Sequence, residues 1–221
     1  MGQSMKQNET DAFTRWLYTD IVKEHFTNPR NVLFGDETEV AEKADGIGTV
    51  GSPVCGDMMK VFIRIDPETD RIKDFRWKTF GCASAIASTS MLSEIVLEGD
   101  GMTIDEAFNL RPQDILSRLG GLPERKIHCS VLGDKALRAA LRDYLAKTGQ
   151  VERIPPEGGR TVCHCLEVTE DDIEDAVVEH NVRTFEHLQA RTKISTGCGE
   201  CREDAELTLA RILKQYELQP D

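Results

Sequence analysis

The chain has 221 residues, of which 39% are hydrophobic and 30% are charged. This profile is typical of a globular protein with one large domain or two small ones, and it excludes a fibrous or disordered chain. The net charge of −12 argues against nucleic acid as a partner, because binding a phosphate backbone requires clustered Lys and Arg. No apolar run is long enough to span a membrane, and the first residues lack the apolar core of a signal peptide. We therefore expect a cytoplasmic protein with no membrane partner.

The first 147 residues predict an α+β fold. An amphipathic helix is predicted over 13–26, with four apolar side chains on one face: Phe13, Trp16, Leu17 and Ile21. Alternating apolar residues at 59–65, a DPETD turn and residues 71–80 predict an antiparallel hairpin. An Ala- and Ser-rich segment with a helical tail follows at 83–99, and apolar steps of three and four residues predict a strong helix over 130–147.

A linker is predicted at residues 148–160, where apolar periodicity is lost and a Pro-Pro pair is followed by Gly-Gly. The domains on either side are predicted at 13–147 and 161–217. Charge supports this division, because residues 162–221 hold 14 acidic and 6 basic side chains, a net charge of −8, which leaves −4 for the preceding 161 residues. The acidity is therefore concentrated in the second domain.

Three cysteines of the first domain, Cys55, Cys82 and Cys129, each lie where a predicted element begins. A helix N-terminus lowers the pKa of a thiol and favours the thiolate that binds metal or attacks sulfur. Asp57 follows Cys55 by two residues and His128 directly precedes Cys129, so thiolates, a carboxylate and an imidazole are available for a mixed metal site. The alternative from spacing alone is that three isolated cysteines are inert core residues.

Four cysteines of the second domain form two tight pairs: Cys163 and Cys165, then Cys198 and Cys201. Each pair projects both sulfurs to one side, so the two pairs together supply four thiolates to one site. Helices capped by Thr169 and Thr184, and a last helix with Ala205, Leu209, Ile212 and Leu213 on one face, predict a small all-helical module around that site. A bound metal centre is expected to stabilise so small a module.

Spacing leaves other uses of these residues open. Four thiolates are typical of structural zinc as well as of an iron–sulfur cluster, and redox-active dithiols are a third alternative. His164, between Cys163 and Cys165, is expected on the solvent side or at the edge of the site and not as a ligand, because Rieske-type ligation needs two histidines. The remaining histidines, His25, His180 and His187, are expected at the surface or at helix ends.

The first domain closely resembles the scaffold proteins of iron–sulfur cluster assembly, the IscU family and the N-terminal domain of NifU. The resemblance covers residues 14–147 and rests on four motifs in order, YTDIVKEHFTNPRNV, IGTVGSPVCGDMM, TFGCASAIASTSMLSE and GGLPERKIHCSVLG. It implies a small antiparallel sheet packed by helices, a homodimer with Tyr18 in its contacts, and Cys129 as the acceptor of persulfide sulfur. It also implies a ligand set for a labile cluster, iron or zinc: Cys55, Asp57, Cys82, His128 and Cys129. The LPERK segment lacks the second proline and the apolar residue that an Hsp70-type chaperone grips, so handling by that chaperone is not implied.

The second domain, over residues 161–217, resembles the bacterioferritin-associated ferredoxin family and the central domain of NifU. The segments VCHCLEVTEDDIEDAV and STGCGECREDAELTLARIL carry this resemblance. It implies a permanent 2Fe-2S cluster on four ligands: Cys163, Cys165, Cys198 and Cys201. A third NifU domain, with a further Cys-x-x-Cys, is not expected because no cysteine follows Cys201.

The two resemblances together imply a scaffold that is not an enzyme. Clusters are assembled on the first domain from iron and from sulfur supplied by a cysteine desulfurase, and are then transferred to apo iron–sulfur client proteins. The second domain, charged by an electron donor, supplies electrons for reduction of persulfide sulfur. The alternatives are a 2Fe-2S electron carrier or redox-regulated binding protein, and an enzyme with Cys129 as nucleophile and His128 as base, although adjacent residues seldom align for that chemistry.

Overall fold

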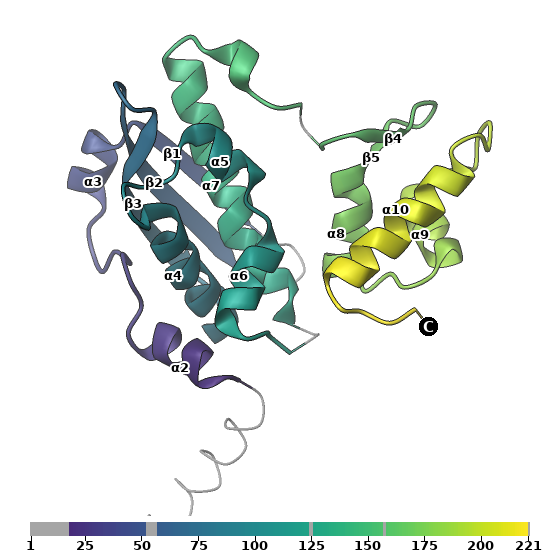
Figure 1. The fold of residues 1–221 in the computed structure, drawn as a ribbon, viewed down its shortest axis with the longest axis horizontal. Helices are drawn as coiled ribbons and strands as arrows, with labels where there is room; N and C mark the ends of the chain where they lie inside the picture. The colour runs from purple at the N-terminus through teal and green to yellow at the C-terminus, as the bar shows by residue number, and fades with distance from the viewer. Residues whose placement is uncertain (1–17, 52–56, 124–125, 157, 221) are drawn as a thin grey trace, which may run out of the picture. The chain divides into compact units, whose positions relative to one another are not determined.

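The computed structural model describes residues 18–51, 57–123, 126–156 and 158–220, without the side chains of His128 and Cys129. The chain divides into two compact units, residues 1–151 and 152–221, and each is described by itself. The first unit holds α2 (Asp20–Thr27), α3 (Thr38–Lys43), β1 (Gly46–Gly51), β2 (Met58–Asp66), β3 (Arg71–Phe80), α4 (Ala83–Leu97), α5 (Ile104–Asn109), α6 (Pro112–Leu119) and α7 (His128–Lys147). A 3₁₀ turn at Val151–Arg153 spans the boundary between the two units. The second holds β4 (Thr161–Cys163), β5 (Val168–Thr169), α8 (Glu170–His180), α9 (Phe185–Thr192) and α10 (Arg202–Gln215) (Figure 1).

The described part of the first unit has an antiparallel sheet in the order β1-β2-β3. The β2–β3 pair is the hairpin predicted from alternation, with Met58 opposite Phe80 at its open end. Its inner side chains are fully buried against α4 and α7, and they include Val61, Phe75 and Trp77. The α+β class is confirmed, with two long helices on one face of a small sheet.

Strand β1 was not predicted, because its sequence GIGTVG has the composition of a loop. Its glycines let the backbone of α7 lie directly on the strand. A Cβ at Gly48 would collide with the carbonyl oxygen of Ala136, and one at Gly46 would collide with that of Ala140. Glycine is therefore required at both positions, because any side chain there would prevent α7 from packing on β1.

Helix α4 is buried on almost all sides, which is typical of a central helix in a small core. Five of its polar side chains are also buried: Ser84, Ser88, Thr89, Ser90 and Ser93. Small residues allow close helix contact, and a Cβ at Gly133 of α7 would lie 2.8 Å from the hydroxyl oxygen of Thr89. The whole Ala- and Ser-rich segment is thus helical, beyond the helical tail that was predicted.

The predicted N-terminal helix is corrected in its start and its face. The part of 13–26 that precedes residue 18 lies outside the described residues, and α2 begins at Asp20 with Thr19 as its N-cap. Ile21, predicted on the buried face, is 44% exposed, whereas Val22 and His25 are buried. His25 was expected at the surface or at a helix end; it lies in the last turn of its helix, and there it is buried.

The second unit packs α8, α9 and α10 around a small core that includes Ile173, Leu188 and Ile212. Thr169 and Thr184 cap α8 and α9 as predicted, and Thr169 forms a full capping box with Asp172. The expectation of an all-helical module is wrong in one respect, because β4 and β5 form a two-stranded antiparallel ribbon that carries Cys163. Across the described residues, no helix is both long and apolar enough to cross a membrane.

Candidate functional site

Asp57 and Cys82 meet at the open end of the β2–β3 hairpin. Asp57 directly precedes β2, Cys82 is the N-cap of α4, and the pairing of Met58 with Phe80 brings these two positions together. The backbone N–H of Cys82 donates to Oδ2 of Asp57 at 3.2 Å. Gly81 permits this approach, because a Cβ there would lie 3.2 Å from the same oxygen and 2.9 Å from the hydroxyl of Thr79. A largely buried carboxylate thus accepts a hydrogen bond from the backbone of the cysteine that caps α4.

The other predicted ligands of the first unit are placed only in part. Cys55 lies outside the described residues. Cys129 was expected just ahead of the last helix. It lies inside that helix instead, because His128 and Cys129 are the first two residues of α7. Helix α7 runs along β1 with Ala140 on Gly46 and Ala136 on Gly48, so its N-terminus points toward the strand end at Gly51.

That strand end is the one that holds Asp57. Gly51 is paired with Met58, the residue after Asp57. The backbone of His128 and Cys129 and the pair Asp57–Cys82 therefore lie at the same end of the sheet. Two helices begin there, and free N–H groups at helix N-termini favour thiolates.

Tyr18 also lies near this end of the sheet. Its hydroxyl is 3.1 Å from the hydroxyl of Ser84, in the first turn of α4 and two residues from Cys82. Ser84 is fully buried and Tyr18 is half-buried. The tyrosine expected in dimer contacts is thus hydrogen-bonded within its own chain, next to the predicted ligands.

In the second unit all four cysteines converge. The sulfurs of Cys163 and Cys165 are 3.7 Å apart, those of Cys165 and Cys198 are 3.6 Å apart, and the thiol of Cys201 is hydrogen-bonded to Cys163. Two thiolates on one tetrahedral metal with bonds of about 2.3 Å are about 3.8 Å apart. Cys163 is buried, Cys201 is half-buried, and Cys165 and Cys198 are exposed. The four thiols are thus joined by contacts that run from Cys201 through Cys163 and Cys165 to Cys198, with one buried side and one side at the surface.

Burial and hydrogen bonds separate three of these thiols by acidity: Cys163, Cys165 and Cys201. Burial alone would raise the pKa of Cys163, but donors from the Ser195 backbone, the Cys201 thiol and the Leu166 backbone lower it to about 7. Burial raises the pKa of Cys201, and its neighbour Cys163 adds to this. The backbone N–H of Cys198 acts to lower the pKa of Cys165, but the thiols of Cys198 and Cys163 outweigh it and the pKa is raised. Cys163 therefore ionises more readily than Cys165 or Cys201.

The loop before Cys198 was not predicted to take part. A Cβ at Gly197 would lie 3.1 Å from the sulfur of Cys165, so the backbone of this loop approaches the site closely. The glycines of STGCGEC are the one signal in the sequence that indicated a tight approach here. His164 is exposed, as predicted.

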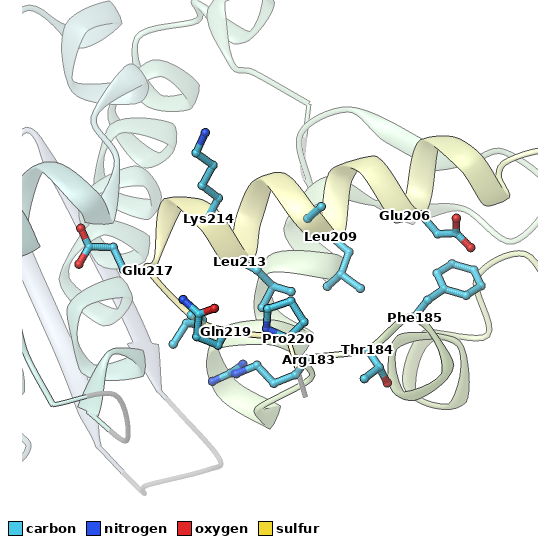
Figure 2. Close-up of a pocket in the computed structure, with 12 residues that line it drawn as sticks. Arg183, Thr184, Phe185, Glu206, Leu209, Leu213, Lys214, Glu217, Gln219 and Pro220 are labelled. Carbon is cyan, nitrogen blue, oxygen red and sulfur yellow. The ribbon is translucent and has the colours of Figure 1, made fainter.

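The second unit also has an apolar pocket that is separate from the four cysteines. This pocket, of about 810 Å³, lies along α10 and is lined by Phe185, Leu209 and Leu213 among others (Figure 2). None of the four cysteines lines this pocket. His180 and His187 are exposed, as predicted.

Comparisons with known proteins match both units. Residues 17–151 match the family model of the NifU-like N terminal domain, and residues 161–211 match that of the BFD-like 2Fe-2S binding domain. The chain is 41% identical to the nitrogen fixation protein NifU of Trichormus azollae over 187 residues, which are 84% of this chain and 61% of that protein. It is 50% identical to the iron-sulfur cluster assembly scaffold protein IscU of Aquifex aeolicus over 135 residues, which are 61% of this chain and 80% of that protein.

The chain thus spans about 61% of the length of the NifU relative from Trichormus azollae. Among solved structures, the N-terminal part of a nitrogen-fixing NifU-like protein from Brucella abortus matches with a TM-score of 0.44 and 20% identity, over 59% of this chain and 96% of that one.

Proposed function

The chain belongs to the NifU-like N-terminal domain family, and on this premise we propose that it is a scaffold on which iron–sulfur clusters are assembled and from which they pass to apo-proteins. The observation that carries the proposal is the meeting of Asp57 and Cys82 beside the start of α7. On this proposal a set of five residues receives the nascent cluster: Cys55, Asp57, Cys82, His128 and Cys129. Cys129 accepts sulfur from the donor protein, and the protein performs no chemical conversion of an organic substrate.

The chemistry of this ligand set suits an iron–sulfur cluster that must be released to another protein. A cluster on four thiolates is retained, whereas one that includes a carboxylate or an imidazole has a weaker ligand for soft iron–sulfide. Asp57 is held in place by the N–H of Cys82, which competes with the metal for the same oxygen. Zinc fits the same mixed donor set, so we expect it to compete with iron for the site.

We expect Asp57→Ala to give a cluster that is longer-lived and transferred more slowly, because the weak ligand is lost. The measurement is transfer from reconstituted protein to an apo-ferredoxin, followed by visible circular dichroism. Asp74→Ala is a matched control, because Asp74 lies in β3 of the same hairpin and is paired with Arg76, away from the site. Transfer from the Asp57 variant at the wild-type rate would contradict the proposed role of the carboxylate.

We further propose that the second unit holds a permanent 2Fe-2S cluster on Cys163, Cys165, Cys198 and Cys201. The four converging sulfurs, with backbone N–H donors on Cys163 and Cys165, support this assignment. When bound, such a cluster accepts and releases one electron at a time. The chain positions it with Cys165 and Cys198 at the surface, where an electron donor has access.

The functional boundaries we propose are an assembly domain at 13–147, a linker at 148–160 and an electron-transfer domain at 161–217. Reducing persulfide sulfur to sulfide requires electrons, and a covalent linker raises the effective concentration of the electron source at the assembly site. Cys198→Ser is expected to leave desulfurase binding intact and to slow assembly driven by a protein reductant. Assembly at the unaltered rate would contradict the electron role.

The partners that follow from this function are a cysteine desulfurase of the NifS or IscS type, apo iron–sulfur client proteins and an electron donor. We propose a homodimer with Tyr18 in its contacts and a cytoplasmic location. Exchange of the Tyr18–Ser84 hydrogen bond for contacts with a second chain would expose the start of α4. Analytical ultracentrifugation of wild type and Tyr18→Ala tests the dimer.

A further inference from the structure

Cys165 and Cys198 form an exposed pair of thiols that the fold brings together. Cys165 lies in the turn between β4 and β5, and Cys198 lies in the loop between α9 and α10, 33 residues further along the chain. Both side chains are exposed. Their sulfurs are 3.6 Å apart, and small side-chain rotations bring two sulfurs from this separation to the bond length of about 2.05 Å in a disulfide. The pair is therefore placed for a cross-link between two distant segments.

The backbone around Cys198 suits such a cross-link. A Cβ at Gly197 would lie 3.1 Å from the sulfur of Cys165, so the absence of a side chain there lets the loop approach that sulfur. On the other side of Cys198, Gly199 has a φ of 78°. Glycine tolerates more backbone conformations than any other residue. A cysteine between two glycines can thus adjust to the geometry that a disulfide requires.

The neighbouring sulfur contact is less suited to oxidation. The sulfurs of Cys163 and Cys165 are 3.7 Å apart, but Cys163 is fully buried. An oxidant dissolved in water reacts first with thiols that it can reach. Exposure therefore favours Cys165 with Cys198 over Cys163 with Cys165.

We propose that Cys165 and Cys198 are a redox-modification site, at which hydrogen peroxide forms a disulfide in the cluster-free chain and so blocks cluster loading. One thiol breaks the oxygen–oxygen bond of peroxide, becomes a sulfenic acid and releases one water; the second thiol then attacks that sulfur and releases a second water. Two thiols thus lose two electrons to one peroxide. A dithiol reductant reverses the reaction. The inference rests on the proposed function of the second unit, because the disulfide removes two of its four proposed ligands.

Two double variants of the full chain test which thiols react. Cys163→Ser with Cys201→Ser keeps the exposed pair and removes its two neighbours. Cys165→Ser with Cys201→Ser is the matched control, because it also keeps one cysteine in each segment but replaces the exposed Cys165 by the buried Cys163. A disulfide between Cys165 and Cys198 is expected in the first variant and is expected to be lost in the second.

The readout is the peptide pattern after treatment of the cluster-free chains with hydrogen peroxide. Trypsin cuts after Lys and Arg, so one cysteine pair falls in the peptide 161–183 and the other in the peptide 194–202. Mass spectrometry without reductant is expected to find these two peptides linked only in the variant that keeps the exposed pair. Equal linkage in both variants, or none in either, would overturn the proposed site.

A loading test on the wild-type chain separates this inference from the function on which it rests. Peroxide-treated chain is supplied with iron and sulfide without a thiol, directly or after reduction with dithiothreitol and its removal. Only the reduced sample is expected to gain a chelator-resistant 2Fe-2S signal in visible spectroscopy. If the reduced sample gains no such signal, the proposed function of the second unit is overturned. If both samples gain it equally, the redox-modification site alone is overturned.

Discussion

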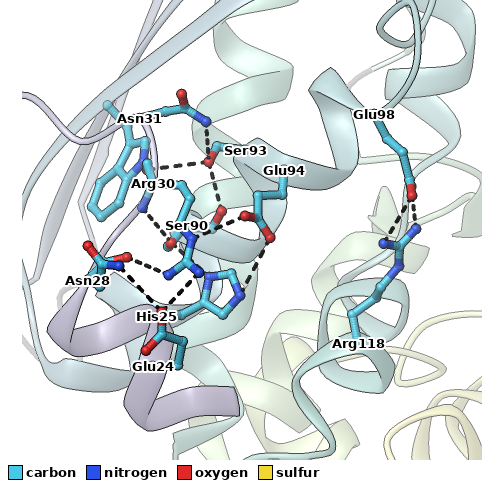
Figure 3. A network of polar contacts seen from close by, with 11 residues as sticks. Glu24, His25, Asn28, Arg30, Asn31, Ser90, Ser93, Glu94, Glu98 and Arg118 are labelled. Atoms are coloured by element: carbon cyan, nitrogen blue, oxygen red, sulfur yellow. Dashed lines mark hydrogen bonds and ion pairs between the residues drawn. The ribbon is translucent and has the colours of Figure 1, made fainter.

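A buried histidine ties the N-terminal helix to the helix that begins at Cys82. His25 is 4% exposed, and its Nδ1 lies 2.8 Å from the hydroxyl of Ser90 on α4 (Figure 3). Its Nε2 is 3.6 Å from Oε2 of Glu94. Arg30 also pairs with Glu94, at 3.1 Å, and with Glu24, at 3.0 Å. This network fastens α2, and with it the segment next to Tyr18, onto α4.

We expect His25→Ala to destabilise the first unit by about 1–3 kcal/mol, which is the usual cost of losing a buried hydrogen-bond partner. The lower part of this range applies if Ser90 keeps its other bond, in which its hydroxyl accepts from the backbone N–H of Arg30 at 2.8 Å. Both tryptophans, Trp16 and Trp77, belong to the first unit, so urea unfolding followed by tryptophan fluorescence reports on that unit alone. His187→Ala, at an exposed position of α9, is the control.

The same histidine predicts a dependence on pH. Burial lowers the pKa of His25 below its ordinary value of 6.5; Glu94 opposes this shift and Arg30 adds to it. A lowered pKa means that the folded state favours the neutral ring, so the contribution of His25 is present above pH 6.5 and is lost as pH falls through its folded pKa. The stability difference between wild type and His25→Ala should therefore be larger at about pH 8 than at about pH 5. An equal difference at both values, or none at the higher one, would refute the reasoning.

Two glycine variants test the close approaches. Gly48→Ala should destabilise the first unit by about 1–3 kcal/mol in the same urea assay, because its Cβ would collide with the backbone of α7 at Ala136 and Ala140. Gly51→Ala in the same strand should cost little, because its Cβ would make only an ordinary contact at 3.7 Å. Equal costs for the two variants would contradict the packing described. Gly197→Ala should lower the iron bound per chain after reconstitution, because its Cβ would lie 3.1 Å from the sulfur of Cys165, and full occupancy would show that the approach is not needed.

The parts of the fold that follow from local patterns were predictable. The β2–β3 hairpin has an alternation that only a half-buried strand explains, and Thr169 and Thr184 are N-caps by side-chain chemistry. Strand β1 was missed because its glycines indicate a loop, and their reason is the α7 backbone above them, which local sequence does not show. The burial of His25 was missed for a similar reason, since its hydrogen-bond partner Ser90 is 65 residues away in the chain.

The candidate site divides in the same way. Spacing was enough to pair Cys163 with Cys165, because that contact is set by two residues of chain, whereas the contact of Cys165 with Cys198 spans 33 residues and depends on the fold. Asp57 and Cys82 are brought together by the register of the hairpin, which the sequence also indicates. The approach of Gly197 to the sulfur of Cys165 was beyond prediction, because it depends on the fold of the loop and not on the spacing of the cysteines.

The central claim is that one site releases its cluster and the other retains it. The most direct measurement is visible spectroscopy of the anaerobically purified full chain, before and after addition of cysteine desulfurase, cysteine and iron, and then of a chelator. We predict a 2Fe-2S signal that is present at the start and resists the chelator, and a second signal that appears only after the addition and is removed by the chelator. One invariant signal throughout would contradict the scaffold and favour a simple electron carrier.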